Sequence, residues 1–180
     1  MVEIDPALLP SYLEELRERF TNRMIKSFDR ALPLSELFLD RWKRAELLKF
    51  GEKTNAYDST YFYGMHNLNV GKGCWVGPFV IIDASGASLK IGDGVSISAG
   101  VKIYTHSAHA YCISEGKKPF VTGPISIGDH TFIGSNAVIC PGVEIGSHCI
   151  IGANSTVMSD IPDYSMAAGS PAKVKKKVIK

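Results

Sequence analysis

The chain contains 180 residues, of which 45% are hydrophobic and 21% are charged, and its formal net charge at pH 7 is +2. This composition excludes a disordered or collagen-like chain and is typical of a globular protein with one core. The start of the sequence lacks the basic stretch followed by an apolar stretch that is typical of a signal peptide. No apolar run reaches the roughly 18 to 20 residues of a membrane span. We therefore expect a cytoplasmic protein.

Residues 1–51 are predicted to form a helical segment. Apolar side chains recur three or four positions apart before and after Pro33: Leu13, Leu16, Phe20, Met24 and Phe28, then Leu37, Phe38, Trp42, Ala45 and Leu48. This spacing is that of one face of a helix, and Gly51 suits the end of the second one. We therefore expect two amphipathic helices that cover another surface. Residues 52–69 have an aromatic, strand-like composition and should lead into the next region.

From Val70 onward, a Val or Ile stands at every sixth position in three runs. A small residue, usually glycine, follows most of them, and a small or modest residue comes four positions after each. A period of six does not fit a helix of 3.6 residues per turn, but it is a multiple of the strand period of two. The pattern predicts a mainly β protein with a hexapeptide β-helix over residues 52–172. The repeated positions are Val70, Val76, Ile82, Ile91, Ile97, Ile103, Ile127, Ile133, Ile139, Ile145, Ile151 and Val157.

Three hexads make one triangular coil of short parallel strands, and equivalent residues of successive coils stack about 4.8 Å apart. The aliphatic ladder fills the interior, and the small residues fit inside the corners. A β-sandwich would instead need strands of variable length with turn signals every 8 to 12 residues. Six unbroken hexads from Ile127 to Val157 argue against that alternative.

The repeat breaks at two places, and function is expected there because regular coils serve as scaffold. Three residues are inserted at 84–86, and the hexads vanish in an extruded loop at about 104–126. His106 follows the coil directly. It should therefore lie near the rigid wall, while the rest of the loop projects outward.

Three chemistries could use this loop. A histidine beside a thioester can act as a general base, because imidazole changes its charge between about pH 5 and 8. His106, His109 and Cys112, with two residues between neighbours, could instead hold zinc. Cys112 could also be a nucleophile that a histidine activates. A fourth interpretation is that the histidines only pack or face solvent, and the spacing alone leaves all four open.

Two segments, ISAGVKIYTH and PISIGDHTFIGSNAVICPGVEIGSHCIIGANSTVMSDIPDYSMAAGSPAKVKKK, resemble the hexapeptide-repeat acetyltransferases, which include galactoside, maltose and xenobiotic acetyltransferases and enzymes that modify surface polysaccharides. The resemblance covers about residues 68–178. It implies a left-handed coil, a homotrimer, and acetyl-CoA bound in a groove between two subunits. It also implies that His106 is the catalytic base, with His109 a weaker match that we assign to the acceptor side.

The resemblance also carries over cofactor contacts. They are Phe132 (where sugar acetyltransferases often have tryptophan), Ser135, Ala153 against the pantetheine arm, Ala168, Gly169 and Pro171 by the nucleotide, and Lys173 and Lys176 near its phosphates. Met158 and Ser159 stand where a threonine–lysine pair is often found, and Ser159 remains a candidate contact. The basic residues 173–180 are predicted as a tail that contributes to phosphate binding, the alternative being a merely solvated tail.

On the acceptor side, Asp83 ends its coil at a position from which the resembling enzymes contact a sugar hydroxyl. Val76 replaces the asparagine of the galactoside enzymes, so galactoside specificity does not transfer. We predict direct transfer of the acetyl group of acetyl-CoA to a hydroxyl or amino group of a sugar-like acceptor, in a ternary complex, with His106 as the base and no metal. No nucleic-acid partner is expected.

Two other functions remain open. A γ-carbonic anhydrase-like metalloenzyme would need three histidines that converge across a subunit boundary. His130 and His148 should stack one coil apart. Each comes three positions after an inward aliphatic residue, however, so both side chains should face outward. The second alternative is a β-helix that serves only as a binding or assembly module.

Overall fold

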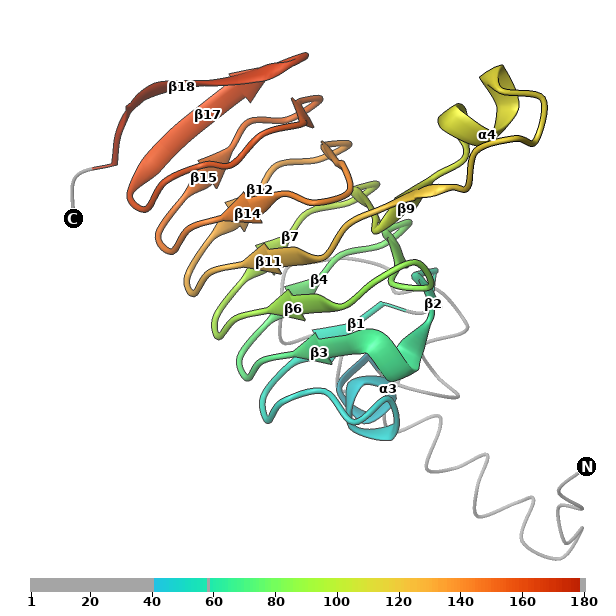
Figure 1. Cartoon of the computed structure of the whole chain (residues 1–180). Helices are drawn as coiled ribbons and strands as arrows, with labels where there is room; N and C mark the ends of the chain where they lie inside the picture. The colour runs from blue at the N-terminus through green and yellow to red at the C-terminus, as the bar shows by residue number, and fades with distance from the viewer. Residues whose placement is uncertain (1–40, 58, 179–180) are drawn as a thin grey trace, which may run out of the picture.

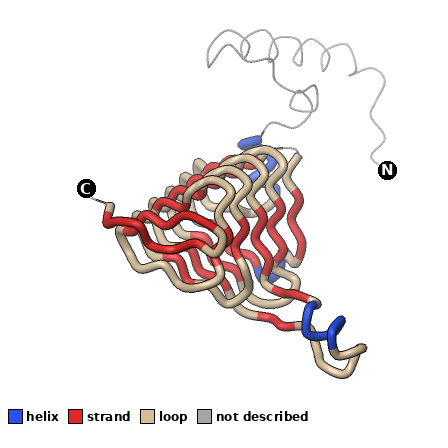
Figure 2. Tube along the Cα trace, turned by 90° about the horizontal axis from the view of Figure 1, so that it is seen from above, coloured by secondary structure: helices blue, strands red, loops and turns tan. Residues whose placement is uncertain are grey.

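The computed structural model describes residues 41–57 and 59–178, which form a three-sided stack of short strands (Figure 1). Figure 2 shows the coils from above, with one loop projecting from an edge of the stack. We call the three sides A, B and C. The chain visits them in that order, so strands of successive coils pair in parallel along each side.

Side A contains, in order, β1 (Asn55–Ala56), β4 (Trp75–Val76), β7 (Ser96–Ile97), β12 (Phe132–Ile133), β15 (Ile150–Ile151), β17 (Ser165–Gly169) and β18 (Ala172–Lys177). Side B contains β2 (Tyr61–Tyr63), β5 (Ile81–Asp83), β8 (Lys102–Tyr104), β13 (Val138–Ile139) and β16 (Thr156–Val157). Side C contains β3 (Leu68–Val70), β6 (Leu89–Ile91), β11 (Ile125–Ile127) and β14 (Glu144–Ile145).

The aliphatic ladder fills the interior of the coil, as predicted. All twelve side chains of the ladder are buried, and none exceeds 6% exposure. On side B, for example, Ile82, Ile103 and Ile139 are partners in parallel register. Burial of each such side chain contributes about 1.5 to 3 kcal/mol relative to leaving it in water. The ladder therefore makes the coil a rigid frame for side chains on its surface.

The coil begins about twenty residues before the aliphatic ladder. Strands β1 and β2 already pair in parallel with β4 and β5, so this segment is a full coil and not merely an entry to one. Its inward residues Phe50, Ala56 and Phe62 keep the spacing of six, and the two phenylalanine rings meet edge to face at 5.2 Å. Aromatic side chains thus replace the aliphatic ones here. A short 3₁₀ helix, η2 (Met65–Asn67), leads from side B to side C.

Helix α3 (Arg41–Leu47) lies at the N-terminal end of the stack (Figure 1) and buries Ala45 in the core. The rest of the predicted helical segment, residues 1–40, lies outside the described residues. No described helix is long and apolar enough to cross a membrane.

Between β8 and β11 the chain leaves the coil. Strand β9 (His106–Ser107) pairs with β10 (Val121–Thr122) in antiparallel fashion, and α4 (His109–Ile113) lies beyond them. Figure 1 shows this loop, in yellow, projecting away from the stack. The coil resumes at β11 and keeps its register, because Ile125 and Ile127 pair with Leu89 and Ile91.

The basic residues at the C-terminal end do not start a tail at residue 173. Lys173, Lys175, Lys176 and Lys177 belong to β18, which pairs with β17 in antiparallel fashion and forms the edge of side A. Ala172 is buried and anchors the strand, whereas the lysines are exposed. Their charges are therefore presented from a fixed backbone.

Candidate active site

His106 lies at the edge where sides B and C meet, at the root of the projecting loop. It is separated from the end of β8 by Thr105 alone and is the first residue of β9. Its side chain is 28% exposed, so the ring is held against the coil while part of it reaches solvent. The backbone on both sides of the histidine is thus fixed by strands.

A carboxylate adjoins this histidine. Asp83 ends β5 on the preceding coil, and its Oδ1 lies 3.9 Å from Nδ1 of His106. That nitrogen is buried and makes no hydrogen bond to any described residue. Asp83 itself is held by Ser85, whose backbone N–H donates to Oδ1 at 3.0 Å and whose hydroxyl also contacts it. The ring therefore has its buried nitrogen directed to a fixed negative charge.

Aromatic side chains of the loop cover the histidine from the other side. The Phe120 ring is nearly parallel to the imidazole, with 6.2 Å between centroids, and Tyr111 meets Phe120 edge to face at 5.3 Å. Both aromatic rings are about half exposed. Sequence reasoning missed Phe120, whose place beside His106 depends on how the loop folds back.

The three candidate zinc ligands are not gathered. Ser107 Oγ and Nδ1 of His109 are 2.9 Å apart, and His109 and Cys112 are exposed on α4. Among residues 41–57 and 59–178, no three His, Cys, Asp or Glu side chains come close enough together to hold a metal ion. At this edge of the coil, His106 instead lies beside Asp83.

His130 and His148 stack on each other at 5.2 Å, and Tyr164 continues the stack at 4.8 Å. They lie at the edge between sides C and A, a different edge from that of His106, and they face outward as the sequence predicted.

The candidate cofactor contacts follow side A and its edge with side B. On the outer face of side A, Phe132 is in register with Ile150, Ile150 with Met166, and Met166 with Lys176. This outer row therefore runs from apolar side chains to a lysine.

Ser135, Ala153 and Gly169 follow one another on successive coils at the edge between sides A and B. The Asn154 N–H donates to the Ser135 carbonyl at 2.9 Å, and the Gly169 N–H donates to Ser155 Oγ at 3.1 Å. Ala168 is in register with Lys173, and Pro171 lies in the exposed turn that follows. The structure thus brings these candidates into one surface.

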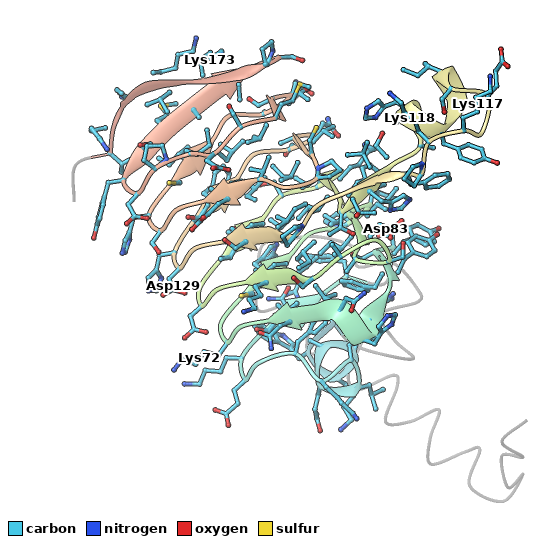
Figure 3. The ribbon with its side chains drawn as sticks, in the orientation of Figure 1. Lys72, Asp83, Lys117, Lys118, Asp129 and Lys173 are labelled. Atoms are coloured by element: carbon cyan, nitrogen blue, oxygen red, sulfur yellow. The ribbon has the colours of Figure 1, made fainter. Side chains whose placement is uncertain are left out.

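Within one chain, this surface and His106 lie apart. His106 lies at the edge between sides B and C, and the cofactor candidates lie beyond side B, whose six residues span at most about 20 Å when extended. Ser159 is the exception, because it follows β16 and lies on the same edge as His106. Figure 3 shows Lys173 and Asp83 on different parts of the surface.

Known proteins resemble this chain in sequence and structure. Residues 124–158 match the family described as bacterial transferase hexapeptide (six repeats). Galactoside O-acetyltransferase of Escherichia coli is 33% identical over 139 residues, which cover 73% of this chain and 67% of that protein. Nodulation protein L of Rhizobium leguminosarum is 43% identical over 118 residues, 63% of this chain. The chain spans only 60% of the length of that protein.

Two solved structures share the fold over nearly the whole chain. A maltose O-acetyltransferase from Clostridium difficile has a TM-score of 0.68 at 27% identity and covers 98% of this chain and 90% of its own. The acetyltransferase VCA0836 from Vibrio cholerae has a TM-score of 0.69 at 26% identity, with 93% of both chains covered. The predicted left-handed parallel β-helix is confirmed, and the chain belongs to the hexapeptide-repeat acetyltransferase family.

Proposed function

We propose that the protein transfers the acetyl group of acetyl-CoA to a hydroxyl group, or an amino group, of a sugar or saccharide acceptor. The observation that carries this proposal is His106, seated on a rigid coil with its buried nitrogen toward Asp83 and its remaining surface open beneath a loop. A partly exposed imidazole that is fixed in this way is suited to remove a proton from a bound acceptor.

The cofactor candidates fit the parts of acetyl-CoA. The apolar outer residues Phe132 and Ile150 suit the pantetheine arm, and Lys173 and Lys176 on β18 suit the nucleotide phosphates. VCA0836 of Vibrio cholerae has been solved in complex with acetyl coenzyme A, which supports the same cosubstrate here. Bound there, acetyl-CoA supplies an activated acyl group as its thioester.

In the proposed reaction, His106 takes the proton of the acceptor hydroxyl or amine. Because Nδ1 is buried, the proton goes to Nε2. The acceptor atom forms a bond to the thioester carbonyl carbon as the carbon–sulfur bond breaks, and the imidazolium returns the proton to the departing thiolate. Asp83 stabilises the positive charge on the ring in the meantime. No step uses an acyl-enzyme or a metal.

We further propose that the active unit is a homotrimer. Within one chain, His106 and all the cofactor candidates except Ser159 lie on different parts of the coil, so one chain does not form a complete site. Exposed apolar side chains on sides A and B, among them Trp75, Phe79 and Phe132, supply a surface for contact with another copy. A closed threefold arrangement would place the base of one chain beside the cofactor surface of the next.

The test is release of free thiol from acetyl-CoA in the presence of matched acceptors. A panel should contain hexoses, disaccharides and nucleotide sugars, each paired with the analogue that carries an amino group in place of one hydroxyl. Acceptor-dependent thiol release that His106→Ala strongly lowers supports the proposal, and comparison within each pair distinguishes oxygen from nitrogen acceptors. Absence of turnover across the whole panel, with acetyl-CoA binding also absent, would favour a binding or assembly module.

A further inference from the structure

We infer that Thr105 is a positioning residue for the base. Its buried hydroxyl fixes the inserted turn at 84–87 against the coil, and this turn seats the imidazole of His106. The inference rests on the proposed function, because it concerns the same base.

The Thr105 hydroxyl uses all of its hydrogen-bonding capacity on this turn. The side chain is completely buried, at 0% exposure. It donates to the carbonyl of Asp83 at 3.0 Å and accepts the backbone N–H groups of Gly86 at 3.1 Å and Ala87 at 3.2 Å. A hydroxyl offers one donor and two acceptor sites, so one side chain satisfies three backbone groups of a turn about twenty residues earlier in the chain.

The same turn contacts both parts of the reactive pair. A Cβ atom added at Gly86 would lie 2.6 Å from Cβ of His106, so the turn packs directly against the base and only glycine fits there. One residue earlier, Ser85 donates its N–H to Oδ1 of Asp83 at 3.0 Å. A displacement of the turn would therefore move the imidazole and the carboxylate relative to each other.

A second buried threonine shows which part of this arrangement is general. Thr54 is 3% exposed, donates to the carbonyl of Gly71 at 2.7 Å and accepts the N–H of Cys74 at 3.0 Å. It joins two coils in the same way, but its partners lie in the first coils, away from His106. Thr54→Val therefore removes a comparable buried hydroxyl without touching the proposed base.

The experiment compares Thr105→Val, Thr105→Ser and Thr54→Val, each in the wild-type and the His106→Ala background. Since misplacement of a catalytic group by about 1 Å can cost about 10²-fold, Thr105→Val should lower kcat by about 10- to 100-fold and leave the KM for acetyl-CoA little changed. Thr105→Ser keeps the hydroxyl and should stay close to the wild-type rate. Thr54→Val should lower the melting temperature and keep kcat.

The His106→Ala background shows whether Thr105 acts through the base. If it does, Thr105→Val should not lower the residual rate of His106→Ala any further, because coupled residues are not additive. An equal loss in both backgrounds, or an equal loss of kcat in Thr54→Val, would overturn the inference and leave Thr105 a structural residue. By contrast, a fully active His106→Ala protein would refute the proposed base.

Gly86→Ala provides a second variant should Thr105→Val fail to fold. The added methyl group would press on Cβ of His106, at 2.6 Å, and on the Thr105 carbonyl oxygen, at 3.0 Å, in a chain that keeps the Thr105 hydroxyl. We expect a lower kcat that again disappears in the His106→Ala background. An unchanged kcat in folded Gly86→Ala would show that the turn does not seat the base.

Discussion

Oδ1 of Asp83 lies 3.9 Å from Nδ1 of His106, across two neighbouring coils of the β-helix. Asp83 ends β5, which pairs in parallel with β8, and His106 begins β9 two residues after the end of β8, so the scaffold sets their separation. Because the carboxylate is only 15% exposed, solvent screens its charge less than at an open surface.

Asp83→Asn should lower kcat by about tenfold or more, which corresponds to about 1.4 kcal/mol of lost stabilisation of the imidazolium. Steady-state kinetics with saturating acetyl-CoA measures this. Asp93→Asn is the matched control: Asp93 also accepts a backbone N–H, that of Lys72 at 3.0 Å, but it lies at the edge between sides C and A. Equal activities of the two variants would remove Asp83 from the mechanism.

The sequence predicts the interior of this fold well, because stacking forces equivalent residues of successive coils into the same register. The ladder from Val70 to Val157 therefore appears in the sequence as a period of six. The period of aliphatic residues does not extend into the first coil, because Phe50 and Phe62 replace the aliphatic residues there and Ala56 fills the position between them. Aromatic rings at that spacing were the signal that could have revealed it.

The site is only partly predictable. The repeat places His106 at its larger break, but only the family resemblance predicts that it is the base; Asp83 is predicted as a contact to the acceptor, and its place beside His106 is seen only in the structure. The role of Thr105 depends on hydrogen bonds to residues about twenty positions away, and the role of Phe120 depends on the path of the loop. For Thr105, alternation with the inward residues Val101 and Ile103 does indicate burial, but not its partners.

Subunit mixing tests the shared site. Ala153→Trp should block the cofactor surface of its own chain, and His106→Ala removes the base. If each site takes its base from one subunit and its cofactor surface from the next, mixed trimers should regain activity at about one quarter of the sites by random assortment. Light scattering should show a trimer. Each variant tested alone should stay inactive. A mixture that remains as inactive as its components would place the whole site within one chain.

Cys112 should not take part in catalysis. It is exposed, whereas burial raises the pKa of the other three thiols, those of Cys74, Cys140 and Cys149. One thiol per chain should therefore react quickly with a thiol reagent at pH 8. Denatured protein, with all four cysteines accessible, provides the reference. The Cys112→Ser variant should keep the wild-type kcat. The wild-type protein should also keep its kcat after extensive chelation of metals. Loss of turnover with EDTA that zinc restores would contradict the proposed mechanism.

Replacing Lys173 and Lys176 with alanine should raise the KM for acetyl-CoA and change kcat much less. Their charges would hold the phosphates equally in the ground state and the transition state, which is uniform binding. Lys72→Ala is the control, since Figure 3 shows Lys72 at the opposite end of the stack. The KM of the double variant for acetyl-CoA should approach the KM of the wild-type protein for a short thioester that lacks the nucleotide. An unaltered KM for acetyl-CoA would leave these lysines as solvated residues on β18.

The two loop histidines provide the sharpest contrast. His106→Ala should lower kcat by about 10²- to 10⁴-fold, the range for a positioned general base, while acetyl-CoA still binds because its proposed contacts lie on side A. His109→Ala should do much less, because His109 is exposed and has Ser107 Oγ 2.9 Å from its Nδ1. General damage to the loop would affect both variants alike. A trimeric His106→Ala protein that keeps most of its rate would exclude this histidine as the base.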